Sequence, residues 1–107
     1  MDATPLCCSP LLAGPLGEDD AVELAAAFKV LADPVRLRLL SLIAAAADGS
    51  ACSCDLEEPV GKSQPTVSHH LSLLADAGLI TKRKVGRWVY CSVVPERLAQ
   101  LRDALGG

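Results

Sequence analysis

Apolar positions along the chain follow a helical period in most of the sequence and an alternating one near its end. Residues 18–32 and 34–46 carry Leu, Val and Ala at spacings of three and four, which predicts two amphipathic helices. The Asp33-Pro34 pair separates them, with the aspartate as N-cap and the proline in the first turn of the second helix. Residues 95–105 repeat leucine at the same spacing and predict a last helix.

Residues 62–78 predict a further short helix with one apolar and one polar face. Val67, Leu71 and Leu74 recur at helical spacing and are expected to face the core. Ser63 is expected to be the N-cap of this helix. The outward face then carries small hydrogen-bonding side chains, namely Gln64, Thr66, Ser68 and His69. Taken alone, this pattern suits a solvated helix face and a recognition helix for a DNA major groove equally well.

The segments on either side of this helix favour the second interpretation. Residues 51–57 predict a short preceding helix, and the turn 59–61 joins the two as in a helix-turn-helix. Residues 79–84 and 87–94 change to strand spacing, with Gly86 at the turn between them. A hairpin directly after a helix-turn-helix is a wing. The expected fold is therefore mainly α with a two-stranded β-hairpin wing, a winged helix-turn-helix.

The distribution of charge is compatible with DNA binding, although the net charge of the chain is −3. Residues 1–59 hold three basic and ten acidic side chains, a balance of −7. Residues 60–94 hold five basic side chains against one acidic, a balance of +4. Only the local field at the docking face decides whether phosphates are attracted. The basic segment coincides with the expected recognition helix and wing.

The 107 residues suffice for one domain, expected at residues 18–105 and preceded by an N-terminal arm, residues 1–17. No apolar run approaches the roughly 20 residues that span a bilayer. The first residues carry no basic region followed by an apolar stretch, so we expect no signal peptide, no membrane partner and a cytoplasmic location. Five cysteines in such a chain argue against a disulfide framework and toward metal or redox chemistry.

These motifs together resemble the ArsR/SmtB family of metal-responsive winged-helix repressors. The similar segments are residues 28–40, which look like the helix pair of the family, 63–71, its recognition helix, and 77–80 with 86–90, its wing. The resemblance covers residues 18–105. It implies homodimers formed through the first and last helices. It also implies binding to double-stranded operator DNA of two-fold symmetry, and release when a metal or metalloid binds.

The resemblance also implies which residues contact DNA. Gln64, Ser68 and His69 are expected to reach bases or phosphates, and Ser63 and Thr66 to reach phosphates. On the wing, Lys84 and Arg87 are expected to hold the backbone or the minor groove. Lys62 would add a phosphate contact that is sensitive to salt.

The cysteines resemble those of the arsenic-sensing branch of this family. That branch carries a Cys-x-Cys-Asp-Leu motif, matched here by residues 52–56, but its usual third cysteine is absent from the following residues 57–59. Trivalent arsenic and antimony, As(III) and Sb(III), are soft and prefer three thiolates. We therefore expect a site shared between subunits, with ligands drawn from Cys7, Cys8, Cys52 and Cys54. The alternative is that Cys7-Cys8 is a disordered reactive pair and Cys52-x-Cys54 serves helix packing.

Other chemistries remain open for the same residues. The thiolates would also bind Cd(II), Pb(II) or Zn(II), or respond to oxidation. Cys91 lies in the second strand of the wing and is expected to be a half-buried small hydrophobe. A small thiol reductase is disfavoured, because the Cys91–Arg97 spacing lacks the glycine-rich backbone of an anion loop. Adjacent His69 and His70 diverge by about 100° on a helix and cannot easily share one metal.

Overall fold

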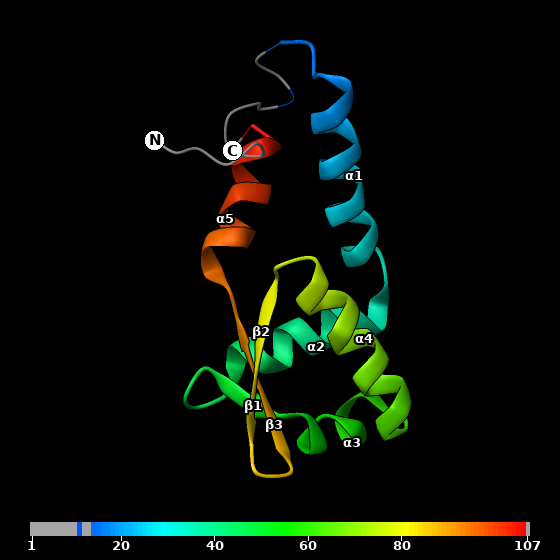
Figure 1. The fold of residues 1–107 in the computed structure, drawn as a ribbon, viewed down its shortest axis with the longest axis vertical. Helices are drawn as coiled ribbons and strands as arrows, with labels where there is room; N and C mark the ends of the chain where they lie inside the picture. The colour runs from blue at the N-terminus through cyan, green and yellow to red at the C-terminus, as the bar shows by residue number, and fades with distance from the viewer. Residues whose placement is uncertain (1–10, 12–13, 107) are drawn as a thin grey trace.

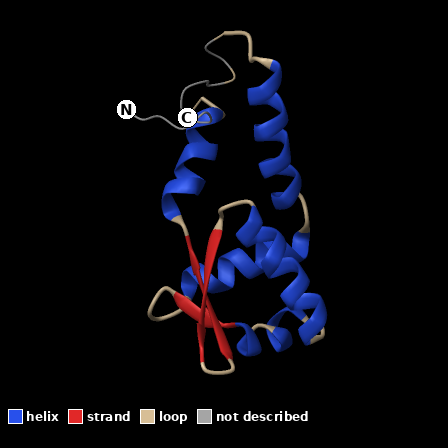
Figure 2. Cartoon of the chain, in the orientation of Figure 1, coloured by secondary structure: helices blue, strands red, loops and turns tan. Residues whose placement is uncertain are grey.

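The computed structural model of the chain describes residues 11 and 14–106. Six segments form helices or helical turns and three form strands within the described residues (Figures 1 and 2). In chain order these are α1 (Glu18–Leu31), α2 (Pro34–Ala45), β1 (Ser50–Cys52), the 3₁₀ turn η2 (Ser53–Asp55), α3 (Glu57–Val60), α4 (Gln64–Asp76), β2 (Ile80–Val85), β3 (Trp88–Val93) and α5 (Pro95–Ala104). This order is that of a winged helix-turn-helix and confirms the expected fold class.

The wing differs from the prediction because its sheet has three strands. β2 and β3 form the expected antiparallel hairpin around Gly86, whose φ of 63° suits glycine at the turn. β1 pairs antiparallel with the other edge of β3, Ala51 opposite Cys91, giving the order β1-β3-β2. The prediction of a short helix over residues 51–57 is therefore wrong for its first two residues, which belong to β1, whereas Ser53–Asp55 form a 3₁₀ turn and α3 begins at Glu57. A three-residue strand leaves no periodic signal, and its conformation is fixed by pairing with a segment about forty residues later.

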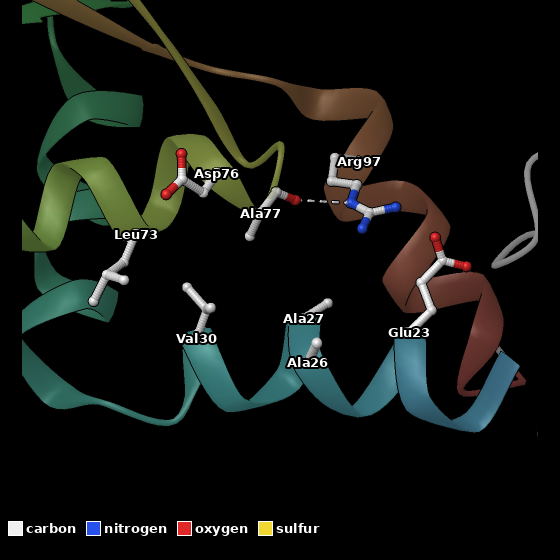
Figure 3. Close-up of a pocket in the computed structure, with 8 residues that line it drawn as sticks. All are labelled: Glu23, Ala26, Ala27, Val30, Leu73, Asp76, Ala77 and Arg97. Carbon is white, nitrogen blue, oxygen red and sulfur yellow. Dashed lines mark hydrogen bonds between the residues drawn. The ribbon is translucent and has the colours of Figure 1, made fainter. Parts of the chain in front are cut away.

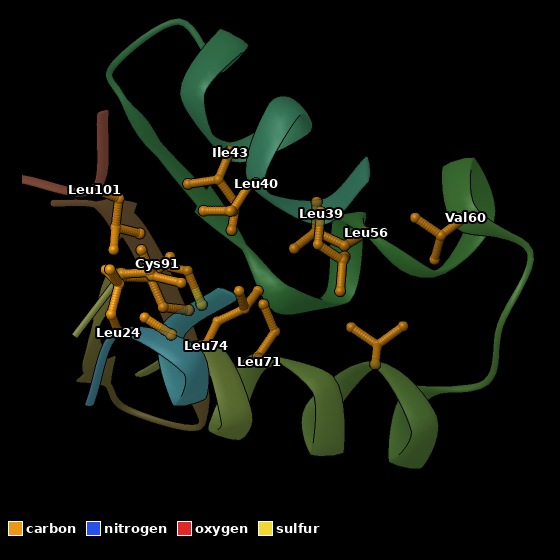
Figure 4. Packing of buried hydrophobic residues seen from close by; sticks show 14 of the residues in the cluster. Leu24, Leu39, Leu40, Ile43, Leu56, Val60, Leu71, Leu74, Cys91 and Leu101 are labelled. Atoms are coloured by element: carbon orange, nitrogen blue, oxygen red, sulfur yellow. The ribbon is translucent and has the colours of Figure 1, made fainter. Parts of the chain in front are cut away.

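The core forms where α2, α4 and the sheet meet (Figure 4). Leu39 and Ile43 of α2 and Leu74 of α4 are fully buried, and Leu71 is 1% exposed. Burying a leucine or isoleucine side chain contributes about 1.5–3 kcal/mol each, so these contacts fix α4 on α2 firmly. The predicted inward stripe of α4 is thereby confirmed, with Val67 also fully buried.

The junction of α1 and α2 is built as the sequence predicts. Asp33 accepts hydrogen bonds from the backbone N–H groups of Val35 (2.8 Å) and Arg36 (3.1 Å), and Pro34 occupies the first turn. These bonds lower the pKa of the Asp33 carboxyl, and the positive charge of Arg36 adds to the effect. Arg36 in turn donates to Val30 O at 2.6 Å, which ties the end of α1 to the start of α2.

Helices α1 and α5 extend away from the rest of the molecule (Figure 1). The radius of gyration is 15.0 Å, against about 13 Å for a compact domain of this length. The two helices leave large apolar side chains exposed, with Val22 at 65% and Leu105, just after α5, at 53%. A hollow of about 280 Å³ lies between α1, the end of α4 and α5, where Arg97 Nε donates to Ala77 O at 3.1 Å (Figure 3).

Two predictions concern the N-terminal cysteines and the absence of a membrane partner. Cys7 and Cys8 lie outside the described residues, so the expected arm and its ligands stay predictions. Within the described part of the chain, none of the helices combines the length and apolar character needed to cross a membrane.

Candidate DNA interface and thiol pair

Helix α4 is amphipathic, with an apolar face packed on the core and a polar face directed outward. Ser68 and His69 are exposed, whereas Gln64 and Thr66 are partly buried, so the front is less fully outward than the sequence suggests. Lys62 and Ser63, just before the helix, are exposed. The predicted DNA-contacting residues of this segment thus lie along one end and one side of α4.

Hydrogen bonds hold the first turn of α4 in a defined arrangement. Ser63 stands at the N-cap position with extended backbone, but its side chain does not cap the helix. Its hydroxyl instead donates to Thr66 Oγ1 at 3.2 Å. Gln64 Nε2 donates to Ser68 Oγ at 3.0 Å, one turn along, and to Ser53 Oγ of η2 at 3.5 Å. Gln64 Oε1 is buried and accepts no hydrogen bond among the described residues.

The two histidines of α4 have different surroundings. His69 is exposed on the outward side. His70 is half-buried, and its Nδ1 lies 3.0 Å from Nη1 of Arg36 on α2. Since guanidinium only donates, this ring nitrogen is the acceptor and the bond holds α4 against α2. The divergence of His69 and His70 around the helix agrees with this placement, and the contact of His70 with Arg36 was not expected from the sequence.

The wing carries its cations at the tip and along one side. Lys84 and Arg87 are both exposed, and the Arg87 guanidinium stacks over the Trp88 ring at 5.0 Å from its centroid. A cleft of about 190 Å³ separates the wing from α4. Its lining brings Gln64, Ser68 and Arg87 together with residues that sequence reasoning missed, Ser53, Ser72 and Lys82.

Lys82 is the clearest of the missed residues. Its Nζ donates to Ser72 Oγ at 3.2 Å, which joins the wing to the middle of α4. The sequence signal was the basic run of residues 82–84, but alternation along a strand does not tell which cation faces the helix. The structure places this ammonium group between α4 and the wing.

Two thiols meet at the junction of the sheet and the helix-turn-helix. Cys52 ends β1 and is 6% exposed, whereas Cys54 lies in η2 and is exposed. Their Sγ atoms are 2.7 Å apart, farther than the roughly 2.05 Å of a disulfide, and both thiols are free. The two sulfur atoms are therefore close enough for one soft ion to bind both of them.

The local electrostatics keeps the Cys54 thiol protonated at neutral pH. The hydrogen bond to Cys52 raises the pKa of the Cys54 thiol to about 11, and burial and the negative charges of Cys52 and Asp55 add to the shift. The Asp55 carboxylate lies 3.8 Å from Cys54 Sγ. A ligand of the pair must consequently displace thiol protons.

The pair has no third ligand in the described part of the chain. No group of three or more His, Cys, Asp or Glu side chains that could hold a metal ion occurs among those residues. The structure thus brings Cys52 and Cys54 together as predicted, although on a strand and a 3₁₀ turn instead of one short helix. Whether Cys7 or Cys8 completes the site is not tested, because they lie outside the described residues.

Cys91 belongs to the core as a small hydrophobe, although it is fully buried and not half-buried as predicted. It is fully buried on β3, and burial raises the pKa of its thiol. It is opposite Ala51, so its neighbour across the ladder is the residue before Cys52. Adjacent strand residues point to opposite faces of the sheet, which separates the Cys91 side chain from the thiol pair.

A recognition helix mounted on a helix-turn-helix, with a basic hairpin wing beside it, defines the chain as a winged-helix DNA-binding protein. Residues 33–82 match the family model described as "Bacterial regulatory protein, arsR family". A protein of Halobacterium salinarum assigned as the arsenical resistance operon repressor ArsR2 is 45% identical over 93 residues, which cover 84% of this chain and 73% of that protein. The chain belongs to the arsR family and is a DNA-binding transcriptional repressor of this family, which is a family of regulators and not of enzymes.

Two further relatives differ in the inducer that their names record. The crystal structure of AntR, an antimony-specific transcriptional repressor, superposes with a TM-score of 0.69 at 34% identity, covering 90% of this chain and 86% of that one. A Staphylococcus aureus protein described as a homologue of the cadmium resistance regulator CadC is 34% identical over 86 residues, 80% of this chain and 69% of that protein.

Proposed function

We propose that this protein represses transcription as a cytoplasmic homodimer on operator DNA and leaves the operator when As(III) or Sb(III) binds its cysteine thiolates. The observation that carries the inducer assignment is the 2.7 Å separation of Cys52 Sγ and Cys54 Sγ at the entrance to the helix-turn-helix. Thiolates in this arrangement suit soft ions, and no group of three or more His, Cys, Asp or Glu side chains that could hold a metal ion occurs in the described residues.

Operator binding follows from the arrangement of α4 and the wing. In a dimer, two recognition helices one duplex turn apart each enter a major groove. Gln64, Ser68 and His69 are the proposed base or phosphate contacts, and Lys84 and Arg87 hold the backbone or the minor groove. Lys62, Ser63 and Thr66 are proposed to bind phosphates at the start of the helix.

The dimer is proposed to form through α1 and α5. Both helices project from the winged part of the molecule and leave apolar side chains such as Val22 and Leu105 uncovered. Large exposed apolar side chains on two neighbouring helices are typical of a surface that a second protein covers.

The chemistry of induction requires three thiols for inorganic arsenite. Each thiol replaces one hydroxyl of As(OH)₃, and its proton leaves with that hydroxyl as water, so three As–S bonds form and three waters are released. Cys52 and Cys54 supply two sulfur atoms. We assign the third to Cys7 or Cys8, from the same or the partner subunit.

The test uses reduced protein under argon and a duplex selected from a random library by the inducer-free protein. Fluorescence anisotropy follows release on addition of arsenite, antimonite, cadmium or zinc. Release of the DNA by arsenite and antimonite without an oxidant supports the proposal. Release by an oxidant but by neither arsenite nor antimonite would contradict it. The C7S/C8S double variant should no longer respond to arsenite. It should still respond to phenylarsine oxide, because a carbon atom already occupies one of the three arsenic bonds and the Cys52 and Cys54 thiols can supply the other two.

A divalent inducer is the second candidate, favoured by the relative described as a cadmium resistance regulator. Cadmium would use the same two thiols, with a further ligand from the arm. Release by cadmium at concentrations below those needed for arsenite would replace the first assignment with this one.

A further inference from the structure

The residue between the two thiols contacts the recognition helix. Ser53 lies in η2 and is 8% exposed, the one buried polar side chain in the described part of the chain. Its Oγ accepts a hydrogen bond from Nε2 of Gln64, the first residue of α4, at 3.5 Å. The thiol pair and the DNA-facing helix therefore share a side-chain contact between elements that are eleven residues apart in sequence.

The Gln64 carboxamide connects this contact to the outward face of α4. Its Nε2 carries two hydrogens, and the second bond goes to Ser68 Oγ at 3.0 Å. Its Oε1 is buried without a hydrogen-bond partner among the described residues, so the orientation of the amide is set by the two bonds from Nε2. Any movement of Ser53 changes the balance of those two bonds and with it the position of Gln64 and Ser68.

We propose that Gln64 is a positioning residue that transmits the state of the Cys52–Cys54 pair, through Ser53, to the DNA-reading face of α4. This inference rests on the proposed function, since it requires an inducer at the thiol pair. The two sulfur atoms, 2.7 Å apart, lie closer together than two sulfur atoms bonded to one arsenic atom can, so arsenic binding must move them apart. This movement turns η2 and takes Ser53 Oγ out of reach of Gln64. At 3.5 Å the contact is already longer than the roughly 2.7–3.2 Å of an ordinary N–H···O hydrogen bond, so a displacement of a few tenths of an ångström suffices to break it.

The same link works in the opposite direction. Operator DNA holds Gln64 and Ser68 in one arrangement, and through Gln64 it also holds Ser53 in place. Bound DNA therefore opposes the binding of arsenic to the two thiols. Linkage requires that the operator weaken inducer binding by the factor by which the inducer weakens operator binding.

The composition of the chain offers a direct spectroscopic test. The sequence contains no asparagine and two glutamines, Gln64 and Gln100. A ¹⁵N–¹H spectrum of the labelled full chain therefore shows two side-chain amide groups. Gln100 lies on α5, where its Oε1 accepts from Arg97 at 3.3 Å, and serves as the internal reference. Arsenite should shift the Gln64 amide signals and leave those of Gln100 within their linewidth. Unchanged Gln64 signals in protein shown by native mass spectrometry to carry arsenic would overturn the proposal.

A variant series measures the coupling itself. The quantity is the ratio of operator affinities without and with saturating arsenite, which for allosteric proteins is typically about 5–150. Ser53→Ala should lower this ratio at least about fivefold, with arsenic still bound. Ser53→Thr keeps the hydroxyl and should stay within about twofold of the wild type. Ser50→Ala removes a hydroxyl from β1, away from α4, and is the matched control.

The outcomes separate this inference from the proposed function. If the ratio of operator affinities without and with arsenite is near one in the wild type, the proposed function is wrong, whatever the variants show. A normal wild-type ratio that Ser53→Ala leaves unchanged defeats the link through Ser53 alone. If Ser53→Ala does not fold, the wild-type spectrum decides, because it needs no substitution.

Discussion

The recognition helix α4 and the thiol-bearing segment β1–η2 lie side by side but are held in different ways. α4 rests on buried side chains, with Val67, Leu71 and Leu74 almost or fully inaccessible. The thiol segment consists of a three-residue strand and a single 3₁₀ turn, held by its ladder with β3 and by two small buried side chains, Cys52 and Ser53. Elements with little buried apolar contact open and shift at lower cost than core elements. In the proposed switch, the inducer therefore binds the segment that moves more easily, β1–η2, and DNA binds the more rigid element, α4.

The largest expected effect comes from removing the support beneath α4. Leu71→Ala deletes a side chain that is 1% exposed and should destabilise the protein by about 2–5 kcal/mol. Operator binding should fall with the folded fraction. Urea unfolding, followed by circular dichroism at one fixed protein concentration, measures the loss. Leu37→Ala is the control, because that leucine is 51% exposed and should cost less than about 1 kcal/mol. Equal losses would show that α4 does not rest on this core.

Substitutions at the thiols are expected to leave the fold intact and abolish the response. Cys52→Ser and Cys54→Ser should each keep operator affinity within about threefold and lose release by arsenite, since a serine hydroxyl is a poor ligand for soft arsenic. Anisotropy with and without arsenite gives both values.

Cys91 provides the matched thiol for this experiment. Cys91→Ala changes a fully buried side chain and should cost about 1 kcal/mol of unfolding free energy, with the arsenite response retained. Loss of the response in Cys91→Ala, or its survival in both serine variants, would contradict the assignment of the inducer site to the Cys52–Cys54 pair.

The same contrast explains which parts of the molecule could be predicted from the sequence. The stripe of α4, the Asp33-Pro34 junction and the hairpin each have a local signal, in periodicity, capping or turn chemistry, and the structure agrees with all three. β1 has none, because its conformation depends on pairing with β3. The cysteine motif indicated that Cys52 and Cys54 act together. The contacts of Ser53 and Lys82 with α4 depend on tertiary packing, which spacing along one strand or turn does not reveal.

The wing should contribute to affinity without altering the switch. Lys84→Ala and Arg87→Ala each remove an exposed cation, and each should reduce the slope of log K against log salt by about 1 if it contacts a phosphate. The fold change caused by arsenite should stay as in the wild type, because neither residue touches the thiol segment. Titrations at several salt concentrations measure both quantities. Lys29→Ala, an exposed cation on α1, should leave the slope unchanged, and a wing variant that behaves like it does not contact DNA.

The smallest expected effect tests the support of α4 from the side of α2. Asp33 caps α2 and lies 3.8 Å from Arg36, which also contacts His70 of α4. The pKa of Asp33 is lowered in the folded protein, so its charge contributes stability above the ordinary value of 3.8, and that contribution is lost as the pH falls through the lowered folded value.

Asp33→Asn keeps an equally good N-cap and removes the charge. The Tm of the wild type should therefore exceed that of Asp33→Asn by a few degrees at most at pH 6, and the difference should vanish well below pH 3.8. Thermal unfolding of both proteins at the two pH values isolates this carboxyl, because the other acidic groups titrate alike in both. A difference that is the same at both pH values would mean that the cap stabilises α2 through hydrogen bonding alone. In that case the charge of Asp33 would contribute nothing to holding Arg36 against the recognition helix.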